Sequence, residues 1–494
     1  MRILARETEL NAMTSTTGPK ASSRKRSEPS DAVRPSSSAA EPAPRPASPE
    51  AADKVGPPLR ILFVSHMDPR VSRGGAEIAA FQMYQTMKVI PGVTAFFLAA
   101  AGGKLEPPLG APIFQPFGEH EYVCTAGGYD HFNHSAQGAS FPAAFRRLLR
   151  ELRPDVVHFH HFANIGLEAF LHVRRELPEA RIVLTLHEYL AICNHFGQMV
   201  KRPGLALCNR ATPRDCARCF PERSDNDFFM RELYIRRFFG LVDQFIAPSH
   251  FLAQRYVEWG VPAKRMAVVE NGMPSAQASR PLPSDENGLV FGFFGQMSML
   301  KGVNLLLQAA VLLAKKRSLR QRIRIDIYGD ASNQPAALRE GMDALVQEAG
   351  TVVAMRGPYE NERVHHLMQD CHAVLVPSIW WENSPLVIQE AFSSRRPVIC
   401  ADIGGMAEKV RNGLDGFHFR AANALSLANL LEELAKNPAR LSSLQATIQA
   451  PPTLDSTVRD TLDLYRSIRT ADASKETLAE ADVRPRELLT ETGC

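Results

Sequence analysis

The class of fold follows from the segment Pro377-Ser-Ile-Trp-Trp-Glu-Asn-Ser-Pro-Leu-Val-Ile-Gln-Glu-Ala-Phe392, which comes directly after a short apolar run. The apolar run predicts a buried strand, and Ser384 and Pro385 suit the N-cap and first position of a helix. Glu382 is then expected in the loop, and Glu390 between one and two turns inside the helix. Such a helix start offers unpaired N–H groups to phosphate, whereas carboxylates suit sugar and ribose hydroxyls.

The same pattern of strand, glycine-containing loop and helix recurs on both sides of this segment. The apolar run before it is Ala373–Val376, and the related stretches are Val290–Gly302, Ile323–Asp330, Arg396–Cys400 and Asp402–Glu408. In open parallel α/β sheets, ligands bind at the carboxyl ends of the strands. The two glutamates are therefore expected at a ligand site.

Composition restricts the classes of protein. The chain has 494 residues, a net charge of +4, 45% hydrophobic and 22% charged residues and eight cysteines. The small charge gives no reason to expect a nucleic-acid partner, and no apolar run reaches the ~18 residues that span a bilayer. Met1–Met13 lacks the apolar core of a signal peptide. A cytoplasmic enzyme is the expectation.

Further apolar runs extend the alternation of strands and helices toward the N-terminus. They are Leu59–Val64, Val156–Phe159, Ile182–Leu186, Gln244–Ala247 and Met266–Val269. Alternation of this kind predicts an α/β protein with two Rossmann-like, doubly wound parallel-sheet domains. The expected segments are a disordered tail at 1–58, a first domain at 59–274, a linker at 275–288, a second domain at 289–450, a helix at 451–468 that returns to the first domain, and a loose tail at 469–494.

A set of motifs in these loops resembles the retaining glycosyltransferases of family 4, also described as glycosyl transferases group 1. The motifs are Gly74-Gly75-Ala76-Glu77 after the first strand, His187-Glu188 after a later one, Pro248-Ser249 with Phe251, Gly295 ahead of Lys301-Gly302, and the paired glutamates. The resemblance covers roughly residues 59–468 and is strongest over 289–420. It implies the GT-B fold, in which two such domains face a cleft.

In the first domain the resemblance implies that the loop with Gly74 and Gly75 abuts the donor phosphates or the acceptor. It places His187 beside the donor sugar, and relatives usually carry Asp where Glu188 stands. Three histidines, His158, His160 and His161, end the preceding strand. They are either hydrogen-bonded structural residues, or one of them reaches the cleft.

In the second domain the resemblance implies that Lys301 neutralises the leaving diphosphate. It also implies that Gly295, in the same loop, is a donor-binding position. Relatives often carry Arg at the position of Gln296, which leaves Lys301 as the main candidate cation. Glu382 would contact the donor sugar, and Glu390 would accept hydrogen bonds from the ribose. The remaining donor-binding positions face the diphosphate through their backbones: Ser384, Pro385, Leu386 and Val387.

Arg356–Tyr359 would line the base pocket, again by resemblance. No metal is expected in catalysis, because a helix start and a lysine already offset the diphosphate charge. Asp225-Asn-Asp227 lies in a polar stretch and predicts a solvated turn or a helix start.

Four cysteines form a second constellation: Cys193, Cys208, Cys216 and Cys219. Four thiolates suit a structural zinc ion, but the first two spacings are long and irregular. Structural zinc, free thiols and disulfides all remain open on sequence grounds. The segment Asn194–Arg223 that carries most of them follows His187, so it is expected over the acceptor side of the cleft.

Phe228–Phe239 interleaves phenylalanines with arginines. This pattern predicts a helix packed on the core with arginines reaching out to solvent. Peripheral contact with an anionic membrane is the alternative.

The resemblance implies transfer of a hexosyl-type sugar from a nucleotide-sugar donor to a glycan, lipid-linked or small-molecule acceptor, in polysaccharide or glycoconjugate biosynthesis. The leaving phosphate is expected to help deprotonate the acceptor. Two alternatives stay open: a GT-B enzyme with a phosphate or sugar-phosphate acceptor, and a non-catalytic binding scaffold. Intact Lys301, Glu382 and Glu390 argue against the scaffold, and Gln296 is its only support.

Overall fold

The computed structural model describes residues 58–72, 74–102, 104–108, 110–125, 127–274 and 279–470. All of these residues fall within one compact unit of the chain. Nearly all of the predicted N-terminal and C-terminal tails lies outside the described residues, as do Arg73 and part of the predicted linker.

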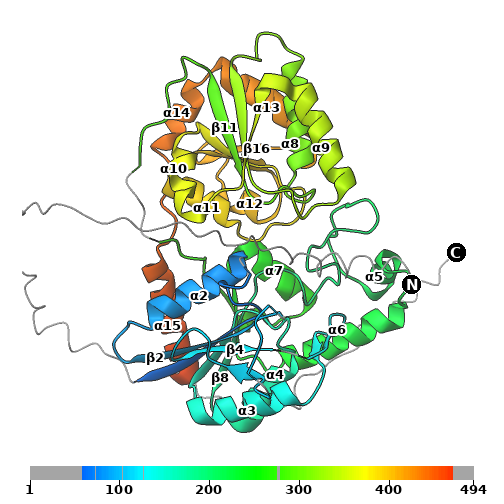
Figure 1. The fold of residues 1–494 in the computed structure, drawn as a ribbon, viewed down its shortest axis with the longest axis vertical. Coiled ribbons are helices and arrows are strands. Elements are labelled where there is room, and N and C mark those ends of the chain that lie inside the picture. The colour runs from blue at the N-terminus through cyan, green and yellow to red at the C-terminus, as the bar shows by residue number, and fades with distance from the viewer. Residues whose placement is uncertain are drawn as a thin grey trace, which may run out of the picture. The chain divides into compact units, whose positions relative to one another are not determined.

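Two sheets organise the described chain, as the sequence predicts (Figure 1). The first has eight strands in the order β10-β9-β8-β7-β1-β2-β4-β3, and every pairing except β3 with β4 is parallel. Its strands are β1 (Leu59–Ser65), β2 (Val93–Ala100), β3 (Ile113–Phe114), β4 (Glu121–Cys124), β7 (Val156–Phe159), β8 (Arg181–Thr185), β9 (Gln244–Ala247) and β10 (Met266–Val268). A separate hairpin pairs β5 (Tyr129–Asp130) with β6 (Ser135–Ala136).

The second sheet has six strands, all parallel, in the order β13-β12-β11-β14-β15-β16. Its strands are β11 (Leu289–Phe294), β12 (Ile323–Tyr328), β13 (Val353–Gly357), β14 (Ala373–Val376), β15 (Val398–Ala401) and β16 (Gly416–Phe419). Chain order reverses between β11 and β14 here, and between β1 and β7 in the first sheet. Ligands of open α/β sheets bind at such reversal points, beyond the carboxyl ends of the strands.

Helices connect the strands and cover the sheets. Those of the first half are α2 (Gly75–Met87), α3 (Ser140–Leu152), α4 (Glu168–Glu176), α5 (Pro213–Cys219), α6 (Asp225–Phe239), α7 (His250–Trp259) and the 3₁₀ turn Ala263–Arg265. Those of the second half are α8 (Val303–Ala314), α9 (Ala336–Ala349), α10 (Val364–Gln369), α11 (Leu386–Ser393), α12 (Gly404–Lys409), α13 (Ala424–Lys436), α14 (Ala439–Gln445), α15 (Leu454–Thr470) and the 3₁₀ turns Gly350–Val352 and Asn361–Arg363.

The strands are apolar along their whole length because both faces of each sheet are covered. β1 illustrates this, since Leu62 and Val64 join one buried cluster while Ile61 and Phe63 join another. The last helix, α15, completes the second of these clusters with the buried side chains Val458, Leu462 and Tyr465. The end of the described chain therefore packs against its beginning (Figure 1).

One local prediction needs correction. Helix α11 begins at Leu386 with Pro385 as its N-cap, and no side chain caps it. Ser384 Oγ is instead buried with no hydrogen-bond partner among the described residues. The extended backbone of Pro385 (φ −62°, ψ 119°) shifts the start by one residue. Asp227 fulfils the helix-start prediction, because it forms a capping box with Ser224 at the start of α6.

Candidate active site

Lys301 and Glu382 meet where the second sheet reverses. The lysine lies between β11 and α8, and the glutamate lies in the loop after β14. Lys301 Nζ is 2.7 Å from Glu382 Oε1, which also accepts hydrogen bonds from Ser378 Oγ at 2.8 Å and Trp380 Nε1 at 2.9 Å. Glu382 is 5% exposed, whereas the Lys301 side chain is 35% exposed. The carboxylate is thus held rigidly, and the ammonium group keeps one side open.

Glycines shape the loop that carries Lys301. Gly302 has φ 75°, and a Cβ added to it would lie 1.9 Å from the carbonyl oxygen of Pro377. Gly295 has φ 146°, a conformation that favours glycine. Gln296 follows it with an exposed side chain. These positions allow the β11–α8 loop to run close against the loop after β14.

The start of α11 presents the predicted diphosphate-facing backbone. The first-turn N–H groups of Leu386 and Val387 have no carbonyl one turn back to bond to. Glu390 follows one turn later on the same helix, and burial raises the pKa of its carboxyl group to about 7. A hydroxyl-rich ligand would give this desolvated group the hydrogen-bond donors that favour its ionised form.

Tyr359 lies near Glu390, and its ring packs 5.7 Å from that of Phe294. Phe294 stacks in turn on Tyr328, with ring centroids 4.7 Å apart. Arg356, in contrast, is paired with Asp326 at 3.1 Å. Aromatic rings therefore gather beside Glu390, where the resemblance implied a pocket for the base.

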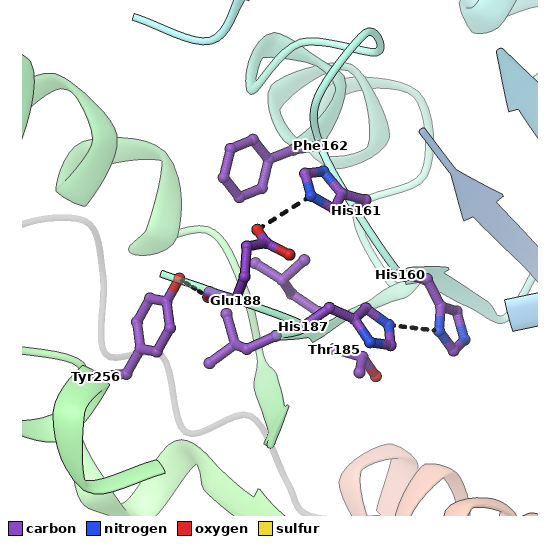
Figure 2. Close-up of a pocket in the computed structure, with 9 residues that line it drawn as sticks. His160, His161, Phe162, Thr185, His187, Glu188 and Tyr256 are labelled. Atoms are coloured by element: carbon purple, nitrogen blue, oxygen red, sulfur yellow. Dashed lines mark hydrogen bonds and ion pairs between the residues drawn. The ribbon is translucent and has the colours of Figure 1, made fainter. Parts of the chain in front are cut away.

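At the reversal point of the first sheet, histidines follow the three neighbouring strands β1, β7 and β8. His161 fixes the orientation of Glu188 (Figure 2). Because its Nδ1 accepts from the backbone N–H of Ala163 at 2.8 Å, its Nε2–H donates to Glu188 Oε1 at 3.1 Å. Burial opposes the charge of Glu188, but the neighbouring imidazoles, His161 first, outweigh burial and lower its pKa to about 2. Glu188 is thus an ionised and oriented acceptor.

His66 and Glu77 extend this polar group. His66 Nε2 lies 3.3 Å from Glu77 Oε1 on α2, and the ring of His66 lies 4.2 Å from that of His161. His66 Nδ1 is buried without a hydrogen-bond partner among the described residues. A Cβ at Gly74 would come within 2.4 Å of Glu77 Oε2, so the glycine gives the carboxylate its room.

Direct contacts join the two groups of predicted site residues. Asn383 Nδ2, one residue after Glu382, donates to the carbonyl oxygen of His187. A Cβ at Gly75 would lie 3.6 Å from the side chain of Leu386 at the start of α11. The structure therefore brings the Gly-Gly turn, His187, Glu382 and the α11 start together.

Further contacts tie this loop to the first domain. Trp381 Nε1 donates to the carbonyl oxygen of Cys208 at 3.1 Å, and the Trp381 ring lies 5.3 Å from that of Phe251. Glu408 accepts hydrogen bonds from the backbone N–H groups of His250 and Phe251 at the start of α7.

Sequence reasoning missed several of these residues. Ser378, Trp380 and Asn383 lie inside the segment that was singled out, and His66 directly follows the first strand. A rule that inspects every polar residue after a parallel strand would have found them.

Helix α6 is packed on the core, but one of its arginines departs from the prediction. Arg231 is 3% exposed, so it does not reach out to solvent. It donates instead to the carbonyl oxygens of Phe132, Ala191 and Leu190 at 2.7–2.9 Å. Within the part of the chain that the structure describes, no helix is both long and apolar enough to cross a bilayer.

The four clustered cysteines line one small cavity, together with His195 and Phe220. All four are free thiols. Across the described ranges, no three or more His, Cys, Asp or Glu side chains are placed to hold a metal ion. Zinc binding by these four cysteines stays a prediction, as do the free-thiol and disulfide alternatives.

Family models match the chain in two consecutive stretches. The model described as Glycosyltransferase Family 4 matches residues 115–277, and the model described as Glycosyl transferases group 1 matches residues 275–450. The second stretch holds Lys301, Glu382 and Glu390, and the first holds His187 and Glu188.

Several curated relatives are similar to parts of the chain. A D-inositol 3-phosphate glycosyltransferase of Streptomyces scabiei is 30% identical over 40% of this chain and 44% of its own length. A lipopolysaccharide 1,2-N-acetylglucosaminetransferase of Salmonella typhimurium is 30% identical over 38% and 51%. The chain thus spans about half the length of these relatives. A D-inositol 3-phosphate glycosyltransferase of Nocardioides is 27% identical over 64% and 68%.

Solved structures share the fold over a larger part of the chain. HepE of Anabaena, crystallised with UDP, has a TM-score of 0.59 at 19% identity and covers 83% of this chain and all of its own. Sucrose-phosphate synthase of Thermosynechococcus elongatus has a TM-score of 0.61 at 17% identity, with 83% and 99% covered. At these identities the likeness establishes the GT-B fold.

Proposed function

We propose that this chain, which belongs to the GT-B glycosyltransferases of the family 4 and group 1 type, transfers a sugar from a nucleotide-sugar donor to an acceptor with retention of configuration. One observation carries the proposal. The Lys301–Glu382 pair lies at the reversal point of the second sheet, beside the start of α11, and is joined to His187 through Asn383. A cation, a helix start and a rigid carboxylate in one place suit a diphosphate attached to a sugar.

Each residue has a role that follows from its chemistry. Lys301 stabilises the negative charge that grows on the diphosphate as the bond to the sugar breaks. The N–H groups at the start of α11 bind the same phosphates. Glu382 accepts hydrogen bonds from sugar hydroxyls with its second oxygen, because Oε1 is already engaged.

We place the acceptor on the first-domain side. Glu188 is ionised and oriented by His161, so it can accept a hydrogen bond from an acceptor hydroxyl. The leaving phosphate takes the acceptor proton in this scheme, because Glu382, the carboxylate nearest the donor sugar, is tied to Lys301. Synthesis of a polysaccharide or other glycoconjugate is the process that such a reaction would serve.

Thermal-shift measurements with UDP-, GDP-, ADP- and CMP-sugars test the donor proposal. UDP-glucose is the first probe, because the structural neighbour from Anabaena was crystallised with it. Stabilisation by one nucleotide sugar, followed by transfer to an added acceptor, is the expected result. A folded protein that none of these donors stabilises would refute the proposal.

A phosphate-bearing acceptor is the second candidate, and the names of the inositol phosphate relatives favour it. Competing transfer assays with a sugar phosphate and with its unphosphorylated sugar separate the two candidates. Preference for the phosphate form would assign the acceptor class.

Replacement of Glu390 tests ribose binding. Glu390→Ala is expected to weaken donor affinity roughly ten- to a hundredfold, because a hydrogen bond to a charged group contributes ~1.5–3 kcal/mol. The fold should survive, since Glu390→Ala removes a carboxyl group that burial already disfavours. Unchanged affinity of the folded variant, measured by calorimetry, would remove Glu390 from the site.

Donor affinity should also rise with pH. Ribose hydroxyls bind the ionised carboxylate, and a pKa of about 7 makes that form scarce at pH 6 and abundant at pH 8. The ionised fraction grows roughly tenfold over this interval, and the dissociation constant should fall in proportion. Glu390→Gln should abolish the dependence. Equal slopes in both proteins would show that another group titrates.

A further inference from the structure

His160 and His187 end two neighbouring strands of the first sheet and contact each other through their rings. Nδ1 of His160 lies 3.2 Å from Nε2 of His187, and the two ring planes differ by 23° with centroids 5.5 Å apart (Figure 2). His160 is 2% exposed, so nothing but protein surrounds most of its ring. One of the two nitrogens must therefore donate a proton to the other.

The second ring nitrogen of His160, Nε2, indicates which of the two histidines donates the hydrogen bond. His160 Nε2 is buried and has no hydrogen-bond partner among the described residues. A buried N–H without an acceptor costs more than a buried lone pair without a donor, and orphaned N–H groups are correspondingly rare. The proton of neutral His160 therefore belongs on Nδ1, which makes His187 Nε2 the acceptor.

Both rings carry a single proton at neutral pH. Burial lowers the pKa of His187 to about 4, and it lowers the pKa of His160 well below its usual value. A neutral His187 that accepts at Nε2 has its own proton on Nδ1.

Contacts with the neighbouring His158 hold the His160 ring in place. The ring of His158 lies 4.2 Å from it, and His158 is itself fixed by Tyr465 Oη at 2.5 Å and by Thr185 Oγ1 at 2.7 Å. His187 is held from the other side, where its carbonyl oxygen accepts from Asn383. These contacts keep the His160 ring and the His187 backbone in place, so the two ring nitrogens stay within hydrogen-bond distance.

We infer that His160 is a positioning residue, whose Nδ1–H donates to His187 Nε2 and so presents the Nδ1–H of His187 as a hydrogen-bond donor toward the donor sugar. The inference rests on the proposed function, which places His187 beside that sugar. In other active sites too, a second residue that hydrogen-bonds to a histidine fixes the tautomer and the orientation of its ring.

Two substitutions of His160 test whether its side chain orients His187 through a hydrogen bond or only fills space. His160→Asn keeps an amide N–H close to the position of Nδ1, whereas His160→Leu fills the space without any donor. His160→Leu is expected to lower the turnover number roughly ten- to a hundredfold with a smaller change in KM for the donor. His160→Asn should recover most of the lost turnover. His172→Asn, on α4, serves as the control and should retain full turnover.

The tautomer itself can be measured without any activity. In ¹⁵N spectra of protein labelled on histidine, with the His187 signals assigned through a His187→Gln variant, Nδ1 of His187 should give a protonated signal and Nε2 an unprotonated one. His160→Leu should redistribute the two signals.

Protonation of His187 at Nε2 in the parent protein would overturn the inference. So would wild-type turnover in His160→Leu, or equal losses in both His160 variants. If His160→Leu does not fold, the parent spectrum and His160→Asn still decide. Failure of every nucleotide sugar to bind would refute the proposed function, yet the spectrum would still report the direction of the hydrogen bond.

Discussion

Lys301→Ala is expected to lower the turnover number about a hundred- to a thousandfold, the range that follows removal of one group that stabilises developing charge. Donor affinity should fall much less. Lys301 is already neutralised in part by Glu382 before any ligand binds, and its charge matters most when the diphosphate leaves. Steady-state kinetics together with direct titration of the nucleotide sugar separate the two effects.

Lys315→Ala is the matched control, because Lys315 also pairs with a glutamate in the second domain, Glu348 at 3.4 Å, and is 65% exposed. It should leave turnover and affinity unchanged. If Lys301→Ala loses turnover and affinity equally, Lys301 is a plain binding residue. Full activity of the variant would exclude Lys301 from the site altogether.

Arg231→Met is expected to lower the free energy of unfolding by about 3 kcal/mol. The substitution removes donors from three carbonyl oxygens, two of them in buried hydrogen bonds, and each buried group left unpaired costs roughly 1–3 kcal/mol, partly offset by the apolar side chain that fills the space. Urea unfolding followed by fluorescence measures the change.

Arg237→Met provides the comparison, since Arg237 is exposed on the same helix. Its effect should stay within about 0.5 kcal/mol. A loss for Arg231→Met no larger than this would mean that the loops around it are held by other contacts. The larger loss should also weaken catalysis, because Leu190 and Ala191 lie only two and three residues after Glu188.

The sequence predicted the parallel sheets and the edge at which the site lies, because both depend on local pattern. The strands Val156–Phe159, Gln244–Ala247 and Ala373–Val376 were predicted with the bounds that the structure has. β2 was missed, although its residues are almost all apolar. β4 was missed because four residues with a glutamate at the start give little pattern.

Contacts between distant residues could not be predicted in the same way. Lys301 and Glu382 were each placed after a strand, but their separation of 2.7 Å depends on which strands are neighbours in the sheet. The burial of Arg231 depends on loops 40 and 99 residues away. A pattern of charges along one helix carries no information on such partners.

Because helix α15 is synthesised after the second domain, the first domain is completed late during synthesis. The first sheet is complete in sequence by Val268, but the cluster on one of its faces lacks Val458, Leu462 and Tyr465 until the helix leaves the ribosome. At about 5–20 residues per second, the missing part follows after roughly 10–40 s. During that interval the nascent first domain exposes an apolar face that chaperones can bind, and a chain truncated ahead of Leu454 would keep it exposed.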